Sequence, residues 1–291
     1  MREFFQESIT NRGLLGTAKR VLTVINRYGM SKNKLCKNLR VFNHVLEEYG
    51  AKATIPITTR VLARNPDILD HLNNERIEVA IHGYVHTDYT KMPYDEIVSH
   101  IESAMTICND MGIRPHGFRA PYLKANNEIM KAIRDVGLEY DSSYTVCFDV
   151  VPKDSVHYAR VYGPPNTSKS RIDSPKLTRI EGTLEIPVAL PDDEMLVDGF
   201  NFAPKEVAKC WVSALKESID VDESIFVLQL HPERVAIMRD ALVEVLEWAD
   251  RSNVRIRGLS EIAENGTRPG SHCMAITGDI DIVKLSDMAR G

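Results

Sequence analysis

The chain has 291 residues and a net charge of −5, with 43% hydrophobic and 26% charged residues, which is typical of a globular protein. The absence of a basic stripe argues against a nucleic-acid partner, and no apolar run reaches the roughly 18 residues of a transmembrane segment. Residues 1–7 do not form a signal peptide, and five cysteines without CxxC spacing indicate a reducing compartment. We therefore predict a cytoplasmic protein.

Short β-rich segments alternate with amphipathic segments along the chain. The predicted strands are residues 51–58, 76–83, 116–122, 138–144, 183–190, 224–231, 254–259 and 274–281. Apolar residues follow helical spacing in the predicted helices, which are residues 35–46, 97–108, 129–136 and 235–246. Asn126 is the expected N-cap of the third helix, and Gly137 ends it.

The alternation of strands and helices indicates parallel βαβ units. We predict an α/β fold, an irregular (β/α) barrel of about seven to eight parallel strands, with residues 1–291 as a single domain. Residues 145–182 are rich in Pro, Ser and Lys, which predicts a long excursion over the barrel mouth with a turn at Pro164-Pro165. The sequence leaves open whether this excursion is a lid and whether the protein forms a homo-oligomer.

Two histidines, His82 and His86, follow an apolar strand at a spacing of four residues. If one helical turn begins at His82, both rings share a face and can bind one Zn²⁺ ion through nitrogen. The alternative is that His82 caps a strand and His86 lies on a surface loop, because an HxxxH spacing alone is a weak signal.

Two further basic residues lie at predicted strand ends. Arg119 would be costly there without a carboxylate partner, which can be a catalytic aspartate or a structural acid. The following Pro121 and Tyr122 either wall a substrate pocket or begin a loop. His231 suits a general acid at the carboxyl end of a barrel strand, and the rival interpretation is a core histidine.

Acidic residues follow three of the predicted strands. Asp141 and Asp193 can contact a substrate or tune His231, and both can equally be loop caps or solvated acids. Asp279 and Asp281 end the predicted strand 274–281. Because side chains alternate along a strand, these two carboxylates leave it on one face, where one can hold a metal while the other acts as a base.

Together these segments resemble the polysaccharide deacetylase family, carbohydrate esterase family four, with its NodB-homology fold. His82-Gly83-Tyr84-Val85-His86 resembles its metal-binding HxxxH motif, Arg119-Ala120-Pro121-Tyr122 its RxPY motif, and Leu230-His231-Pro232 its late Leu-His motif. The segment 52–57 resembles the strand that precedes the family's histidine motif.

The chain departs from the family at its opening motif, a strand that ends in TFDDG or TFDVD. No aspartate of this kind lies near the segment 21–26, whereas 275–281 resembles the TFDVD form, with Gly278 in place of Phe. The first and last strands of a closed barrel are neighbours, so we predict a circular permutation in which residues 274–281 fill the first strand's position. The alternative is a degenerate relative that binds no metal.

The resemblance implies a metal-dependent hydrolase that removes an N-acyl group, foremost N-acetyl, from a small-molecule or lipid-linked amino sugar. The implied metal is Zn²⁺, with Co²⁺, Ni²⁺ or Mn²⁺ as alternatives, and its implied ligands are Asp281, His82 and His86. Asp279 would be the general base, oriented by Arg119, and His231 would protonate the leaving amine. From the residues themselves, we expect Pro121, Tyr122, Asp141 and Asp193 to contact the substrate. The rival functions are a non-catalytic carbohydrate-binding protein and an amidohydrolase acting on a non-sugar amide.

Overall fold

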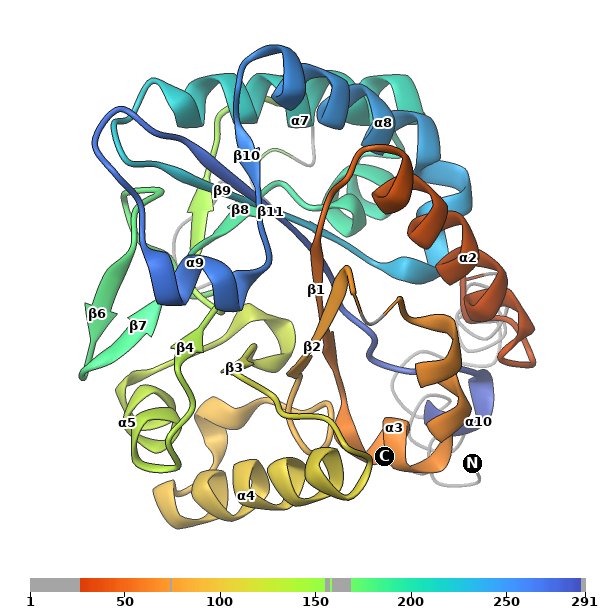
Figure 1. Cartoon of the computed structure of the whole chain (residues 1–291), viewed down its shortest axis with the longest axis vertical. Coiled ribbons are helices and arrows are strands. Elements are labelled where there is room, and N and C mark those ends of the chain that lie inside the picture. The colour runs from red at the N-terminus through yellow and green to blue at the C-terminus, as the bar shows by residue number, and fades with distance from the viewer. Residues whose placement is uncertain (1–26, 74, 155–157, 159–168, 289–291) are drawn as a thin grey trace.

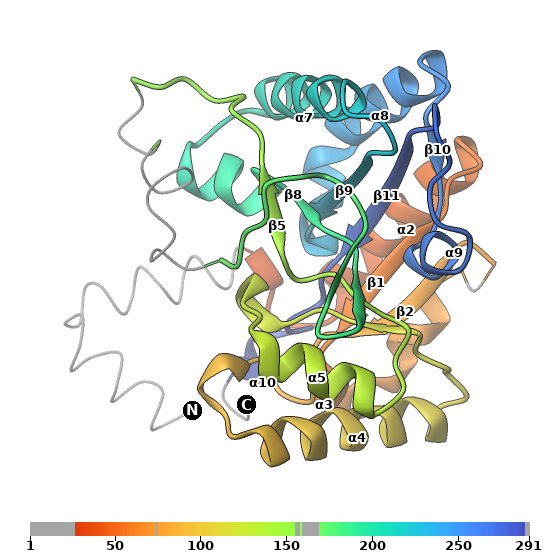
Figure 2. The same ribbon diagram turned by 90° about the vertical axis from the view of Figure 1, so that its left-hand side faces the viewer.

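A mostly parallel sheet curls on itself and is wrapped by helices (Figures 1 and 2). The computed structural model describes residues 27–73, 75–154, 158 and 169–288. Its strands are β1 (Ala53–Ile57), β2 (Ile77–Ile81), β3 (Gly117–Phe118), β4 (Tyr140–Asp141), β5 (Thr145–Cys147), β6 (Thr178–Ile180), β7 (Thr183–Glu185), β8 (Val188–Leu190), β9 (Ile225–Leu230), β10 (Arg255–Ile256) and β11 (Cys273–Gly278). Among these strands, the pairing of β6 with β7 is antiparallel and the others are parallel.

The sheet closes into a barrel because β7 and β8 are almost continuous. The strands follow the order β5-β8-β9-β11-β1-β2-β3-β4-β7-β6, and β10 pairs with β11. Only Ile186 and Pro187 separate β7, which pairs with β4, from β8, which pairs with β5 and β9. The stretch 183–190 therefore links β4 on one side of the sheet to β9 on the other, and the predicted irregular α/β barrel is confirmed.

The helices are α2 (Asn33–Glu48), α3 (Thr59–Arg64), α4 (Tyr94–Asp110), α5 (Asn127–Asp135), α7 (Pro204–Ile219), α8 (Val235–Arg251), α9 (Leu259–Asn265) and α10 (Leu285–Met288). Short helical turns are η1 (Pro66–His71), η2 (Tyr89–Lys91), η3 (Pro121–Leu123), η5 (Met195–Gly199) and η6 (Pro232–Arg234). The four predicted helices correspond to α2, α4, α5 and α8, and the Asn126 side chain accepts the Ile129 N–H as the expected N-cap.

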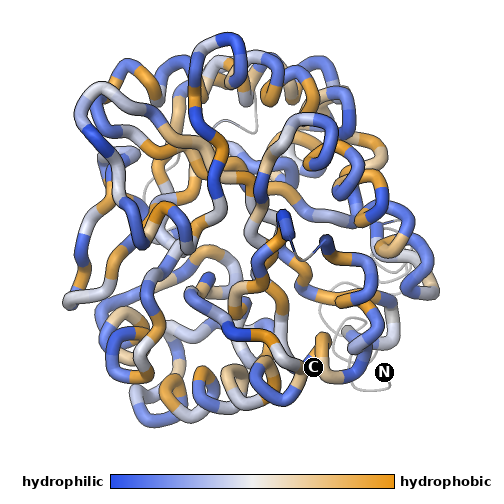
Figure 3. The backbone as a smooth tube through the Cα atoms, viewed as in Figure 1, coloured by the Kyte–Doolittle hydropathy of each residue, from blue (hydrophilic) through white to orange (hydrophobic). Residues whose placement is uncertain are grey.

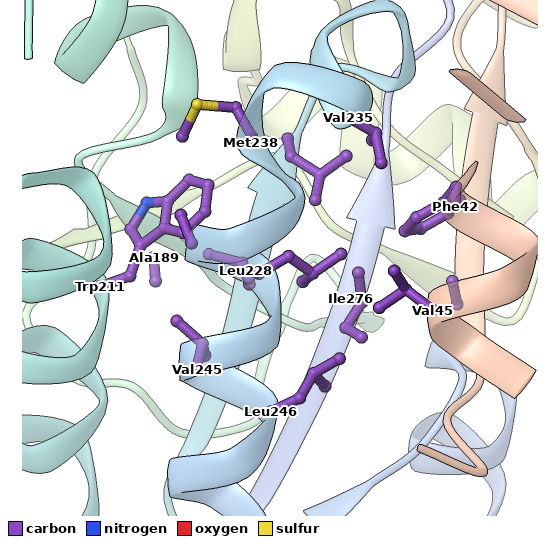
Figure 4. Packing of buried hydrophobic residues seen from close by; sticks show 14 of the residues in the cluster. Phe42, Val45, Ala189, Trp211, Leu228, Val235, Met238, Val245, Leu246 and Ile276 are labelled. Atoms are coloured by element: carbon purple, nitrogen blue, oxygen red, sulfur yellow. The ribbon is translucent and has the colours of Figure 1, made fainter. Parts of the chain in front are cut away.

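The largest hydrophobic cluster lies between α2, α7, α8 and the outer face of the barrel (Figure 4). Leu228 of β9 and Ile276 of β11 point outward into this cluster, where they meet Trp211 and Val245 of the helices. The helices alternate hydrophobic and hydrophilic residues (Figure 3), as expected of helices that bury one face.

The inner faces of β9 and β11 change from apolar to polar along each strand. At their amino ends, Ile225 and Val227 share a second cluster with Cys273 and Ala275. Because side chains alternate along a strand, the inward row of β9 continues as Gln229 and, just past the strand, His231. The inward row of β11 continues as Thr277 and, just past the strand, Asp279 and Asp281. Polar chemistry is therefore placed at the carboxyl end of the barrel.

Helix α9 covers the opposite end of the barrel, where it lies across the front in Figure 1. The carboxylate of Glu78, near the start of β2, accepts hydrogen bonds from Thr54 Oγ1 at 2.6 Å, Tyr140 OH at 3.0 Å and the Ser260 N–H at 3.0 Å. These contacts tie β1, β2 and β4 to α9 and close the amino end.

The predicted excursion over residues 145–182 is partly wrong, because its two ends are strands of the sheet. Thr145 begins β5 beside β8, and Thr178–Ile180 forms β6 against β7. Residues 155–157 and 159–168, including the predicted turn at Pro164-Pro165, lie outside the described residues. Within the described part of the chain, no helix has the length and apolar character needed to cross a membrane.

Candidate active site

The two histidines of the HxxxH segment meet through a loop, and the helical turn considered from the sequence is absent. Gly83 has φ +77°, a left-handed conformation that a helix does not contain. The Tyr89 hydroxyl accepts the Tyr84 N–H at 2.7 Å and lies where a side chain at Gly83 would collide with it. The loop nevertheless brings the rings of His82 and His86 to a centroid distance of 5.1 Å.

Asp281 completes a cluster with these histidines. Its Oδ1 lies 3.2 Å from His82 Nε2 and 3.4 Å from His86 Nε2, and one ligand atom from each residue lies within 4.8 Å of the others. Burial would raise the pKa of Asp281, but the charge of His86 and the neighbouring His82 ring hold it well below its ordinary value. The carboxylate is therefore ionised.

The cluster fits a divalent metal ion. Asp281 Oδ1 is buried and accepts no hydrogen bond from the described residues. His82 Nδ1 lies 2.9 Å from the carbonyl oxygen of Arg119, which fixes the tautomer whose Nε2 lone pair faces Asp281. Two imidazole nitrogens and one carboxylate oxygen form a donor set that suits Zn²⁺ and leaves a position for water or substrate.

Asp279 is held by two protein donors at the end of β11. Its Oδ1 accepts a hydrogen bond from Arg119 Nη1 at 2.8 Å, and its Oδ2 accepts one from Gln229 Nε2 at 2.8 Å. Arg119 is fully buried and also donates to the Ser142 carbonyl at 2.7 Å and to Thr277 Oγ1 at 2.7 Å. The expected carboxylate partner of Arg119 is thus Asp279.

His231 forms a buried ion pair with Asp193. Its Nδ1 lies 2.7 Å from Asp193 Oδ1, and its backbone N–H donates to Asp193 Oδ2 at 3.0 Å. Burial lowers the pKa of His231, but the charge and hydrogen bond of Asp193 raise it to about 10. Burial raises the pKa of Asp193, but His231 lowers it to about 2. Of the two roles considered for Asp193, the structure therefore shows contact with His231.

The His82–His86–Asp281 cluster, Asp279 and His231 lie close enough for their charges to shift one another's pKa values. Besides the effects of burial, the charge of Asp279 raises the pKa of His82 and the charge of His231 lowers that of Asp281. The groups taken from β2, β9 and β11 therefore meet at the same end of the barrel, as their positions at strand ends predict.

Tyr122 forms an aromatic wall beside this cluster. Its side chain is 50% exposed, and its ring meets that of His86 edge-on at a centroid distance of 4.5 Å. Lys124 lies 6.0 Å from the Tyr122 ring centroid and donates to Asp88 at 2.8 Å, which links this wall to the histidine loop. Pro121 is buried at the start of the same turn. Substrate contact by Pro121 and Tyr122 stays a prediction.

Asp141 lies fully buried beside a second buried acid, Glu185. Asp141 Oδ1 accepts a hydrogen bond from Ser143 Oγ at 2.8 Å. Burial raises the pKa of both carboxyl groups, and the nearby charge of Asp141 raises that of Glu185 further. Its contacts are with protein groups, and a role in substrate binding stays a prediction.

Three residues that hold the site were not predicted from the sequence. Gln229 and Thr277 each lie two positions before a predicted site residue on the same strand, and strand alternation was the signal that could have identified them. Ser142, whose carbonyl and hydroxyl oxygens both accept from Arg119, carries no such signal.

Comparison with known proteins points to one family. The family model for polysaccharide deacetylase matches residues 37–140. A bifunctional xylanase/deacetylase of Pseudobutyrivibrio xylanivorans is 34% identical over 91 residues, which are 31% of this chain and 15% of that protein. A peptidoglycan deacetylase-like protein of Gibberella zeae is 31% identical over 67 residues, 23% of this chain and 20% of that protein. The chain thus aligns with only a small part of either relative.

Solved structures show the same fold. A protein assigned as a polysaccharide deacetylase from Mycobacterium smegmatis has a TM-score of 0.63 at 20% identity, covering 89% of this chain and 86% of that one. Another from Pseudomonas aeruginosa PAO1 has a TM-score of 0.57 at 18% identity, covering 83% of this chain and 74% of that one. At these identities the likeness concerns the fold.

Proposed function

The chain belongs to the polysaccharide deacetylase family, and on that basis we propose that it is a metal-dependent hydrolase that removes an N-acyl group from an amino sugar or a sugar-containing precursor. The observation that carries this proposal is the meeting of a His82–His86–Asp281 cluster with Asp279 and His231 at one end of the barrel. Amide hydrolysis needs an electrophile, a base and an acid, and this set supplies a place for each.

A divalent ion would be held by His82, His86 and Asp281. Zn²⁺ suits two imidazoles and one carboxylate best, and Co²⁺, Ni²⁺ and Mn²⁺ are the expected substitutes. When bound there, such an ion supplies Lewis-acid polarisation of the amide carbonyl and lowers the pKa of water. The contact of His82 Nδ1 with the Arg119 carbonyl keeps this ligand in the tautomer that binds.

Proton transfer would be divided between two residues. Asp279, oriented by Arg119 and Gln229, accepts a proton from the attacking water. His231 is protonated at neutral pH because Asp193 raises its pKa to about 10, and it gives that proton to the leaving nitrogen as the amide bond breaks. The products are an amine and a carboxylic acid. The exposed ring of Tyr122 offers a stacking surface for a sugar at the mouth.

We also propose that residues 1–291 form a single, circularly permuted domain in which β11 fills the place of the family's first strand. Two observations support this proposal. Strand β11 lies between β9 and β1, with Thr277 beside Thr54. The family match covers residues 37–140, whereas Asp279 and Asp281 lie far beyond it, near the other end of the sequence.

The test is acyl release from a panel of N-acyl amino sugars by protein that is stripped with a chelator and then reloaded with Zn²⁺ or Co²⁺. We expect activity to depend on the metal and to be lost in Asp279→Asn, which keeps the metal ligands. Asp250→Asn, at an exposed position on α8, is the matched control and should retain activity. Metal-loaded protein that releases no acyl group from any member of the panel would refute the proposal.

A further inference from the structure

Gln229 has a fixed orientation inside the barrel. It is 3% exposed, and its Nε2 donates to Asp279 Oδ2 at 2.8 Å. A carboxylate oxygen can only accept, so rotating the amide would set two acceptors against each other. Asp279 therefore directs the amide oxygen of Gln229, Oε1, away from itself.

This amide oxygen has no donor within the described part of the protein. Gln229 Oε1 is buried and accepts no hydrogen bond from any residue that the structure describes. Two neighbouring groups are already engaged. Arg119, the other donor to Asp279, also donates to Ser142 and Thr277, and Thr277, the strand partner of Gln229, donates its hydroxyl to the Leu228 carbonyl at 3.3 Å. A buried acceptor without a donor is rare in folded proteins, which calls for a donor that is not among the described residues, such as a water or a group of the substrate.

The position of Gln229 along β9 indicates which part of a substrate meets it. Gln229 pairs with Thr277 and precedes His231 by two residues on the same face of the strand, so it lies about 7 Å deeper in the barrel. The leaving nitrogen of the proposed reaction meets His231, nearer the mouth. The acyl part of the substrate, on the other side of the scissile bond, therefore lies toward Asp279 and Gln229.

We propose that Gln229 selects the acyl group, and that its Oε1 accepts a hydrogen bond from a donor carried by that group. This inference rests on the proposed function and deepens it by naming the acyl class. The methyl of an acetyl group has no donor, whereas the NH₂ of a carbamoyl group and the OH of a glycolyl group each supply one. A site built to hydrogen-bond a substrate rejects the analogue that lacks the bond.

The first test compares three substrates that share one sugar: N-carbamoyl-, N-glycolyl- and N-acetylglucosamine. We expect the Zn²⁺-loaded wild type to favour at least one donor-bearing substrate over the acetyl compound by about tenfold or more in kcat/KM. Gln229→Leu should abolish that preference, and Gln229→Met, which also lacks the acceptor, serves if the leucine variant does not fold. A wild type that prefers the acetyl compound, or a preference unchanged in the variant, overturns the inference.

A second test does not require turnover. The dissociation constants of acetate and glycolate are measured on Zn²⁺-loaded wild type and variant. The preference for glycolate is the ratio of the acetate dissociation constant to the glycolate dissociation constant. Glycolate can chelate the metal in both proteins, so this effect cancels when the preference is compared between wild type and variant. We expect this preference to be at least about fivefold greater in the wild type, and equal preferences would show that Gln229 makes no such contact. If no amide is hydrolysed, the proposed function fails while this comparison still decides on Gln229.

Discussion

The substitution Asp193→Asn should remove the charge that keeps His231 protonated. In the wild type, Asp193 Oδ1 lies 2.7 Å from His231 Nδ1, and the pKa of His231 is raised to about 10 although burial lowers it. The amide of the variant can still accept a hydrogen bond but carries no charge, so burial becomes the dominant influence. The pKa of His231 should then fall to its ordinary value of about 6.5 or below.

The size of the effect follows from the fraction of His231 that carries a proton. At pH 8 this fraction is about 0.99 for a pKa of about 10 and about 0.03 for a pKa of about 6.5. If His231 is the acid, Asp193→Asn should therefore lower kcat/KM by about 30-fold at pH 8 and by far less at pH 5.5. The alkaline limb of the pH profile should move to lower pH.

The assay is the pH dependence of kcat/KM for wild type, Asp193→Asn and the control Asp192→Asn. Asp192 is the adjacent buried acid, and it pairs with Lys169 at 2.7 Å instead of with His231. An alkaline limb that stays in place in Asp193→Asn, or that moves as far in the control, would refute the role given to the His231–Asp193 pair.

The same pair should contribute to stability over a defined pH range. Because the pKa of His231 is raised on folding, this residue contributes to the free energy of unfolding. The contribution is fully present below pH 6.5 and is lost as the pH rises through about 10. Because the pKa of Asp193 is lowered on folding, this residue also contributes to the free energy of unfolding. Its contribution is fully present above pH 3.8 and is lost as the pH falls through about 2. The difference in free energy of unfolding between wild type and Asp193→Asn, measured with urea, should be largest between these limits of 3.8 and 6.5.

Three further changes test the site and its support. Asp281→Ala should lose the bound ion in elemental analysis of the reconstituted protein, and a full complement of metal would contradict the ligand assignment. Arg119→Met should lower the free energy of unfolding by about 3–5 kcal/mol, because it leaves Asp279 buried without its cation, and a loss below about 1 kcal/mol in urea titrations would be inconsistent with that pairing. Gly117→Ala should lower the free energy of unfolding by about 1–3 kcal/mol, because the new methyl group would overlap the ring of Tyr140, its pairing partner in β4. The control Gly199→Ala places its methyl group in open space and should change the free energy of unfolding little in the same titration.

The fold could be predicted from the sequence because its elements have strong local periods. Strand alternation predicted that Asp279 and Asp281, which directly follow β11, share one face, and the apolar spacing located α2, α4, α5 and α8. The loop after His82 could not be predicted in this way. Its left-handed Gly83 depends on the packing of Tyr89, which is a tertiary contact that an HxxxH spacing does not reveal.

Polar contacts between residues distant in the chain do not follow from local patterns. The family resemblance implied that Arg119 orients Asp279, which lies 160 positions away, but nothing in the sequence indicated the contact of Gln229 with Asp279 across 50 positions. Local patterns indicate that a charge at a strand end needs a partner, but only the closed sheet decides which partner it obtains. Gly278 illustrates the same limit, since a side chain there would collide with Pro232, the residue after His231.

The two aspartates of β11 show how neighbours separate the roles of chemically identical groups. Alternation places both carboxylates on one face and gives no reason to distinguish them. In the folded chain Asp279 has each oxygen held by a protein donor, which fixes its orientation, whereas Asp281 Oδ1 faces two imidazole nitrogens and accepts no hydrogen bond from the described residues. A carboxylate oxygen left open between two histidines is suited to a cation, and one oriented by Arg119 and Gln229 is suited to directing a proton. The division of labour that we propose thus arises from β2, β3 and β9, the strands that carry those partners to β11.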